Sequence, residues 1–217
     1  MEIVVIGDSV VSGENNNFKS FTNYLPYDNV TKVGVSGTTI GEYSIYPVDG
    51  KSLLSQIRNY EKIIKTADVI LLHYGVNDTS ALALGNCSSN MFIINYVKAI
   101  DYLKQLNPKA KIKFLLMTDC TFVAAKYADL HVPYLKEYLK YMPIEFNTVS
   151  WFRAYGFVAS TIKQKCEVIS LFDDVDTLIR YLDKDKIHPN DEGYRYIAKL
   201  IERKLEEDKN EMFDYRN

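Results

Sequence analysis

Ile3-Val4-Val5-Ile6-Gly7-Asp8-Ser9, near the start of the chain, joins an uninterrupted apolar run to a glycine and two polar residues. Near-continuous runs of Val, Ile and Leu are typical of parallel strands that are covered on both faces of the sheet. Four further runs of this kind follow along the chain, at Val30–Val35, Val69–Tyr74, Ile112–Met117 and Val168–Phe172. The sequence therefore predicts a sheet of five parallel strands, the first of which ends in a polar turn.

Helical patterns separate these runs. Apolar residues recur every three or four positions within residues 53–64, 93–103 and 194–205. The last pattern follows Pro189, so we expect Asn190 to cap a C-terminal helix whose charged end, after Leu205, frays. Strands that alternate with helices predict an α/β fold with right-handed crossovers, and the 217 residues suit a single domain spanning 1–217.

One connection is much longer than a single crossover helix requires. It runs from Asp119 to Lys165 and is rich in Tyr, Trp and Phe. We expect an extra pair of helices that packs its aromatic side chains on the body of the protein. The alternative is that residues 119–165 form a lid or wall beside a substrate site.

Composition excludes several classes of partner. The net charge is −2 and no long basic run is present, which disfavours nucleic acid and anionic membrane surfaces. No apolar run reaches the roughly 18–20 residues that span a bilayer, so no integral membrane association is expected. Residues 1–7 lack the features of a signal peptide, and we expect a cytoplasmic protein or one released without a Sec signal.

Neither a cofactor nor a metal is expected. The chain has no GxGxxG after its first strand and no P-loop, and the acidic cluster at residues 173–176 is expected to be a solvated helix start. The cysteines are odd in number, form no CxxC pair, and are expected to be small buried residues rather than disulfide or zinc partners. They are Cys87, Cys120 and Cys166.

Polar residues cluster where the predicted strands end. In open α/β sheets, ligands bind beyond the carboxyl ends of the strands. Three strands run directly into short polar segments, and a fourth such segment precedes the last helix. The segments are Gly7-Asp8-Ser9, Gly34-Val35-Ser36-Gly37, Gly75-Val76-Asn77-Asp78 and Asp185-Lys186-Ile187-His188-Pro189. We therefore expect these segments to meet at one edge of the sheet.

A serine, a histidine and an aspartate in this set suit nucleophilic catalysis. A serine hydroxyl needs a base within hydrogen-bond reach, and His188 can take the proton of Ser9. Asp185, three residues earlier, can hold the other ring nitrogen and stabilise the imidazolium. The oxyanion of a tetrahedral intermediate needs donors, which the backbone N–H groups of Ser9 and Gly37 and the side-chain amide of Asn77 can supply.

The four segments resemble, in order, the four sequence blocks of the SGNH (GDSL-like) hydrolase family. The resemblance runs from the first strand to the last helix. It implies a flavodoxin-like three-layer α/β/α sandwich and ester hydrolysis through an acyl-enzyme. It also implies Ser9 as nucleophile, Asp185 and His188 as its acid–base pair, and Gly37 and Asn77 as oxyanion donors. The first block reads GDSV rather than GDSL, and Lys32 stands where the second block often has Asn.

The neighbouring polar residues are expected to have structural rather than catalytic roles. Asp8 and Asp78 are expected to lie just behind the reacting groups, Asp78 as a support for the Asn77 loop. Ser36 is expected to be a turn hydroxyl, since no GxSxG elbow is present. We expect His73 to be a core residue rather than a pocket residue, and His131 to lie at the surface.

These observations predict a serine esterase that acts on a small-molecule or carbohydrate ester. Short-chain acyl esters and carbohydrate O-acetyl esters remain open as substrates. A long-chain lipase is disfavoured because no strongly apolar exposed helix is apparent. The alternative is an inactive carbohydrate- or ligand-binding module on the same fold. The sequence does not indicate the oligomeric state.

Overall fold

The computed structural model describes residues 1–46, 48, 50–139 and 141–214. Its centre is a sheet of five parallel strands in the order β2-β1-β3-β4-β5. The strands are β1 (Glu2–Gly7), β2 (Asn29–Gly34), β3 (Val69–His73), β4 (Lys111–Leu116) and β5 (Glu167–Ser170). Each predicted strand is present within two residues of its expected bounds, and the order 2-1-3-4-5 is that of a flavodoxin-like fold.

The continuous apolar runs reflect burial in the middle of the sheet. All five residues of β3 are buried, as are all of β1 after Glu2. β2 lies at one edge of the sheet and only Val33 of it is fully buried. Because parallel strands at the centre are covered on both faces, β1 and β3 carry the uninterrupted apolar sequences.

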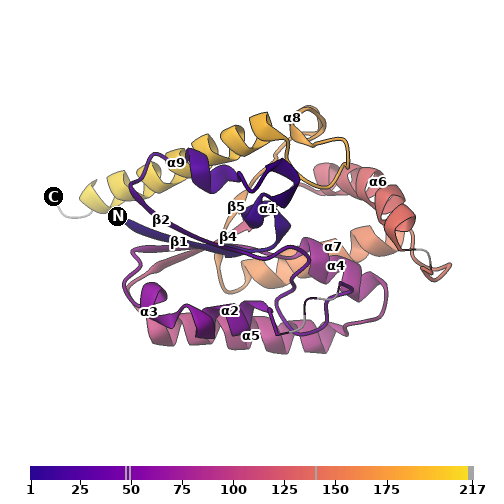
Figure 1. Cartoon of the computed structure of the whole chain (residues 1–217), viewed down its shortest axis with the longest axis horizontal. Helices are drawn as coiled ribbons and strands as arrows, with labels where there is room; N and C mark the ends of the chain where they lie inside the picture. The colour runs from indigo at the N-terminus through magenta and orange to yellow at the C-terminus, as the bar shows by residue number, and fades with distance from the viewer. Residues whose placement is uncertain (47, 49, 140, 215–217) are drawn as a thin grey trace.

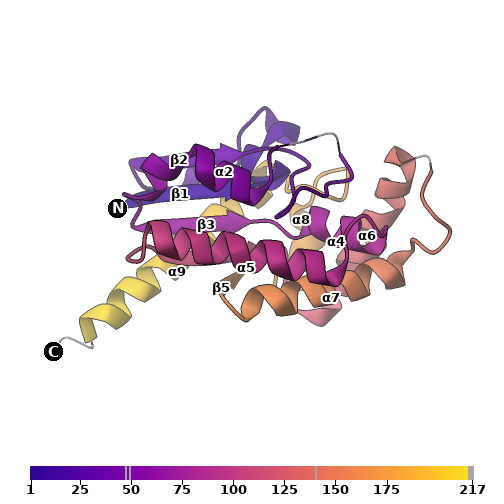
Figure 2. The ribbon, with the colours of Figure 1, turned by 90° about the horizontal axis from the view of Figure 1, so that it is seen from below.

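Helices cover both faces of the sheet (Figure 1). On one side lie α1 (Ser9–Ser12) and α9 (Asp191–Asp214), and on the other lie α2 (Leu53–Asn59), α3 (Glu61–Ile64) and α5 (Ser89–Leu106). Figure 2 shows α5 running alongside β3 over the second face. The fold is thus the three-layer α/β/α sandwich that the sequence predicts.

Two helical patterns differ in detail from expectation. The pattern over residues 53–64 forms two short helices that break at Tyr60, which is exposed. In α5, Phe92 and Tyr96 face the core while Ile93 is exposed. Tyr96 also donates a hydrogen bond to the Ile162 carbonyl (2.7 Å). The larger aromatic side chains therefore set the buried face of α5.

The C-terminal helix is longer than expected. Asn190 caps it, as predicted, by accepting from the backbone N–H of Gly193 (2.8 Å). The expectation that the chain frays after Leu205 is wrong, because α9 continues to Asp214. Asp208 lies 2.8 Å from the ammonium of Lys113, a buried residue of β4, and this ion pair anchors α9 beyond Leu205.

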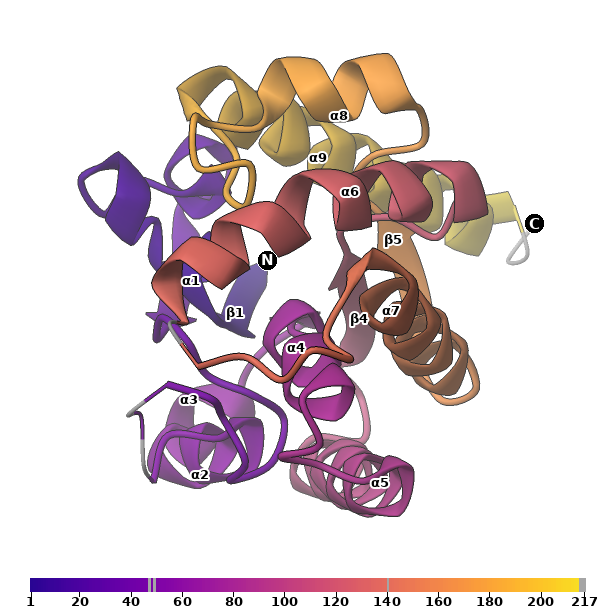
Figure 3. The same cartoon turned by 90° about the vertical axis from the view of Figure 1, so that its right-hand side faces the viewer.

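The long connection between β4 and β5 forms two helices, α6 (Thr121–Tyr138) and α7 (Thr148–Lys163). They pack against each other, and α7 also packs against α4 (Val76–Ala83). Figure 3 looks at the carboxyl ends of the strands, and α6 passes in front of them. A further helix, α8 (Val175–Tyr181), contacts both α6 and α9. The added helix pair therefore borders the edge of the sheet where the polar segments converge.

Candidate active site

Ser9 is the first residue of α1 and lies directly beyond the end of β1. Asp8 caps this short helix by accepting a hydrogen bond from the Val10 N–H (3.0 Å). Gly7 leaves no room for a side chain, since an added Cβ would lie 2.7 Å from the His73 carbonyl oxygen. The tight turn therefore presents Ser9 at the edge of the sheet while Asp8 stays buried behind it.

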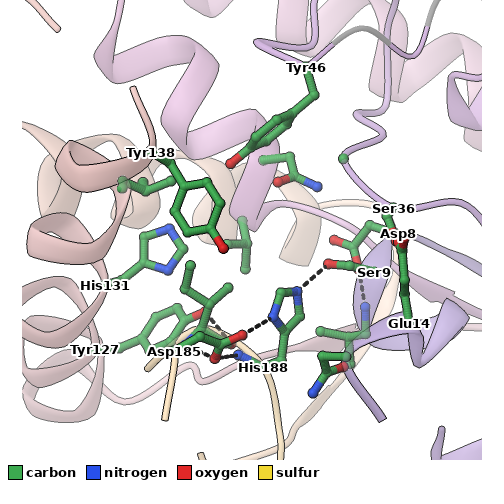
Figure 4. Close-up of a pocket in the computed structure, with 17 residues that line it drawn as sticks. Asp8, Ser9, Glu14, Ser36, Tyr46, Tyr127, His131, Tyr138, Asp185 and His188 are labelled. Carbon is green, nitrogen blue, oxygen red and sulfur yellow. Dashed lines mark hydrogen bonds and ion pairs between the residues drawn. The ribbon is translucent and has the colours of Figure 1, made fainter. Parts of the chain in front are cut away.

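His188 connects Ser9 to Asp185 (Figure 4). Its Nε2 lies 2.8 Å from Ser9 Oγ, and its Nδ1 lies 2.6 Å from Asp185 Oδ2. The other carboxylate oxygen of Asp185 accepts from the backbone N–H groups of Ile187 (2.9 Å) and His188 (3.0 Å). The carboxylate thus folds the turn that carries His188 and also orients its ring.

Asp185 is held in its charged form. Burial would raise the pKa of this carboxyl, but the hydrogen bonds and charge of His188, with the two backbone N–H donors, outweigh burial and lower the pKa to about 2. Above that pH the carboxylate is ionised and can accept a hydrogen bond from a protonated Nδ1. The other ring nitrogen, Nε2, is then free to act as a base.

Gly37 and Asn77 face the same pocket as Ser9. Gly37 has φ +76°, and an added Cβ would lie 3.0 Å from Tyr46, so both conformation and space favour glycine. The Asn77 amide donates one hydrogen bond to the Thr38 carbonyl (3.0 Å). This bond fixes the orientation of the amide and leaves its second N–H available.

Asp78 joins the two loops that carry these donors. Its carboxylate accepts from the Ile40 N–H (2.9 Å), the Tyr43 hydroxyl (2.7 Å) and the Gly75 N–H (3.1 Å). It is completely buried and is not among the pocket residues. Burial raises its pKa to about 6, although these three hydrogen bonds oppose the rise. Its contacts are those of a support for the loops rather than of a group that meets substrate.

His73 supports the Ser9 turn from within the core. It is fully buried at the end of β3, and its Nδ1 lies 3.0 Å from Asp8 Oδ1. Its placement agrees with the core interpretation drawn from the sequence. The same Asp8 oxygen accepts the Val10 N–H that caps α1. His73 and Val10 therefore both contact one oxygen of the Asp8 carboxylate.

Lys32 and Ser36 both contact the loop that follows α1. The Lys32 ammonium donates to the carbonyl oxygens of Ser12 (3.2 Å) and Phe18 (2.7 Å), and burial lowers its pKa. Ser36 pairs with the Ser12 hydroxyl (3.1 Å) and donates to Glu14. Lys32 therefore ties the loop to β2, and Ser36 is a turn hydroxyl that has no contact with His188 among the described residues.

The pocket in front of Ser9 has a volume of about 370 Å³. One of its walls comes from α6, which contributes Tyr127, His131, Leu135 and Tyr138. Figure 4 shows the rings of Tyr127, His131 and Tyr138 directed from α6 toward the pocket, with Tyr46 approaching from another side. Part of the 119–165 segment is thus a wall of the pocket; whether that wall moves as a lid remains a prediction.

The expectation that His131 lies at the surface is wrong. The side chain is buried because its ring packs between those of Tyr127 (centroids 5.2 Å apart) and Trp151 (5.0 Å). The many aromatic residues of the segment indicated packing of this kind. Nothing in the sequence around Ser9, Asp185 or His188 indicated that α6 would border the pocket. The spacing of Tyr127, His131 and Leu135, four residues apart, places them on one helix face and was the available clue.

The remaining polar clusters lie outside the pocket. Asp174 caps α8 by accepting from the Thr177 N–H (2.8 Å). No group of His, Cys, Asp or Glu that could hold a metal occurs within the described residues. Cys87 and Cys166 are buried as expected, whereas Cys120 is only half-buried because it lies at the exposed start of α6. No helix in the described ranges is long and apolar enough to cross a bilayer.

Comparison with known proteins relates this arrangement to one family and several solved structures. A family model described as the GDSL-like lipase/acylhydrolase family matches residues 5–196. No curated protein sequence matches the chain. The lipase Lip_vut3 from goat rumen metagenome is 16% identical, with a TM-score of 0.58, and the match covers 93% of this chain and 95% of that one.

Two esterases of known structure are also similar in fold. The acetyl xylan esterase AlAXEase is 15% identical, with a TM-score of 0.56, over 93% of this chain and 98% of its own. A carbohydrate esterase, whose active site is described as having divergent catalytic and non-catalytic binding functions, is 19% identical, with a TM-score of 0.58. That match covers 94% of this chain and 68% of that chain.

Proposed function

Because the chain belongs to the GDSL-like lipase/acylhydrolase family, we propose that it is a serine esterase in which Ser9, His188 and Asp185 hydrolyse a carboxylic ester through an acyl-enzyme. The observation that carries the proposal is the continuous chain of contacts from Ser9 Oγ through His188 to Asp185, at 2.8 and 2.6 Å. Family membership by itself supports ester hydrolysis only in general terms.

The first half-reaction follows from these contacts. His188 Nε2 removes the proton as Ser9 Oγ attacks the ester carbonyl carbon, and Asp185 stabilises the imidazolium. The carbonyl oxygen becomes an oxyanion, for which the backbone N–H groups of Ser9 and Gly37 and the amide of Asn77 are the proposed donors. Collapse breaks the bond to the alcohol oxygen, which takes the proton from His188 and leaves as the alcohol.

The second half-reaction repeats the same steps with water. His188 takes a proton from a water molecule as its oxygen attacks the acyl carbon, and a second tetrahedral oxyanion forms at the same donors. Collapse releases the carboxylic acid, and the proton returns through His188 to Ser9 Oγ. The enzyme is unchanged, and one water is consumed for each ester bond that is cleaved.

The pocket supports a small substrate. Its volume of about 370 Å³ lies near the lower end of the range for small-molecule sites, roughly 300–1,000 Å³. Short-chain acyl esters and O-acetylated carbohydrates fit this size. The fold similarity to a protein named as an acetyl xylan esterase adds support for the second class.

A non-catalytic binding role is the second candidate. It is suggested by the structurally similar carbohydrate esterase whose active site is described as having non-catalytic binding functions as well as catalytic ones. The hydrogen bond between Ser9 and His188 favours catalysis instead, because a binding site has no need of a base aligned on a serine hydroxyl.

Initial rates on a series of p-nitrophenyl esters, from acetate to octanoate, test the proposal. We expect hydrolysis of the short esters, with kcat lowered by several orders of magnitude in Ser9→Ala and in His188→Ala. Ser36→Ala is the matched control, because Ser36 lines the same pocket without contacting His188. Turnover that persists in Ser9→Ala contradicts the proposal, and no turnover by folded wild type favours the binding role.

A further inference from the structure

His131 is a buried polar side chain that the proposed reaction does not use. It is 2% exposed, on α6, and it lines the pocket in front of Ser9. Neither of its ring nitrogens has a hydrogen-bond partner among the described residues. Native proteins pair nearly all of their buried polar atoms, because an unpaired one costs roughly 1–3 kcal/mol. No described residue supplies that partner, so the arrangement points to a group that enters the pocket.

The aromatic rings around His131 fix its orientation. Tyr127 and Trp151 pack against the imidazole, and the hydroxyl of Tyr127 and the indole N–H of Trp151 are bonded elsewhere, to Ile187 O and Ser80 Oγ. Figure 4 shows the ring edge of His131 directed toward the pocket. The ring thus stands at the pocket wall with both nitrogens buried, and a ligand hydroxyl reaches them by pressing into that wall.

At neutral pH His131 is an uncharged imidazole. Burial lowers its pKa to about 3, and His188 shifts it in the same direction. A neutral imidazole has one N–H donor and one nitrogen acceptor, so it pairs best with groups that can both donate and accept. Hydroxyl groups meet this requirement, whereas carboxylates lack a proton to donate and alkyl chains can form no hydrogen bond.

The position of His131 points to the alcohol portion of the ester as its partner. It lines the same pocket as His188 and Asp185, the pair that delivers a proton to the leaving oxygen. The alcohol part of an ester must lie next to His188 Nε2 to receive that proton. We propose that His131 is a specificity-determining residue that hydrogen-bonds a hydroxyl group on the alcohol portion of the ester, so that the preferred substrates are monoesters of polyhydroxy alcohols, including sugars.

This inference rests on the proposed function and narrows its substrate class. In the free protein both nitrogens are buried and have no partner among the described residues. A substrate hydroxyl that reaches the nitrogens supplies the missing hydrogen bond, whereas a plain alkyl group leaves them unpaired. Discrimination against the alkyl ester follows from this difference.

Two esters with the same carbon skeleton isolate the effect. Glycerol 1-monoacetate and n-propyl acetate differ only in the two hydroxyl groups of the alcohol, and acid release in a pH-stat gives kcat/KM for each. We expect wild type to prefer the glycerol ester, and His131→Phe to lower the ratio of the two kcat/KM values by about tenfold, the effect of one neutral hydrogen bond. His131→Gln, which keeps a donor and an acceptor, should restore part of the ratio.

Tyr134→Phe is the matched control, since it removes a hydroxyl from an aromatic residue on the same helix outside the pocket lining. An unchanged ratio in His131→Phe, or an equal fall in Tyr134→Phe, overturns the role of His131 while the esterase proposal stands. Hydrolysis of neither ester by folded wild type contradicts the proposed function itself. The two failures are therefore distinguishable.

Discussion

The hydroxyl of Tyr127 donates a hydrogen bond to the carbonyl oxygen of Ile187, the residue immediately before His188 (3.1 Å). Tyr127 belongs to α6, in the long connection between β4 and β5, and lies 60 residues away from Ile187 in the sequence. The bond joins the pocket wall to the turn that carries the proposed base. The helix pair added at 119–165 therefore braces this turn as well as lining the pocket.

Tyr127→Phe should loosen the turn without emptying the core. The substitution keeps the buried ring but leaves the Ile187 carbonyl unpaired, so we expect the free energy of unfolding to fall by about 1 kcal/mol. We also expect kcat for a p-nitrophenyl ester to fall more than KM rises, because His188 is held less firmly. Tyr102→Phe, which removes a hydroxyl bonded to Glu61 far along the chain from the site, should leave kcat unchanged.

Asn77→Ala should slow the chemical step. Removal of one oxyanion donor lowers kcat by about 10²–10³ in other serine hydrolases, and the Asn77 amide is already oriented by the Thr38 carbonyl. Steady-state kinetics on one short p-nitrophenyl ester measure the change, with circular dichroism to show that the variant is folded. A fall of less than about threefold would mean that Asn77 does not contact the oxyanion.

Asp78 should make stability fall between about pH 4 and pH 6. Its pKa is raised from 3.8 to about 6 in the folded protein, mainly by burial. In this interval the folded state keeps a proton that the unfolded state has lost, so rising pH removes up to about 3 kcal/mol of stability. Asp185, with a pKa of about 2, gains its stabilising charge mostly at lower pH. His131, whose pKa is lowered to about 3, makes stability rise over the same interval, so the Asp78 contribution is measured as the difference between wild type and Asp78→Asn.

Urea unfolding at pH 4, 5 and 6 measures this contribution. Asp78→Asn has no titrating group, so the Asp78 contribution to the slope should disappear from it. The same pH dependence in wild type and variant would show that another group is responsible.

The sheet could be predicted from the sequence because central parallel strands must be apolar on both faces. That requirement produces the uninterrupted apolar runs at Ile3–Ile6 and Val69–His73. These runs lie within two residues of the observed strand bounds. The C-terminal extent of α9 could not be predicted in this way. Beyond Leu205 the helix is held by the ion pair of Asp208 with Lys113, and the sequence contains no sign that Lys113 is buried.

The convergence of the polar segments was also predictable, because parallel strands end at the same edge of a sheet. In the structure His188 lies within hydrogen-bond distance of both Ser9 and Asp185, although 179 residues separate it from Ser9 in the sequence. The α6 wall was not predictable to the same degree. Tyr127 and His131 reach the pocket through the packing of α6 across the sheet edge, which depends on tertiary contacts with α7 and α8 rather than on any local motif.

Covalent labelling tests the central claim most directly. A fluorophosphonate probe phosphonylates an activated serine with loss of fluoride, and intact-mass spectrometry counts the adducts. We predict one adduct on wild type and on Ser36→Ala, and none on Ser9→Ala. An adduct that persists on Ser9→Ala, or its absence from folded wild type, would contradict the claim that His188 and Asp185 activate Ser9.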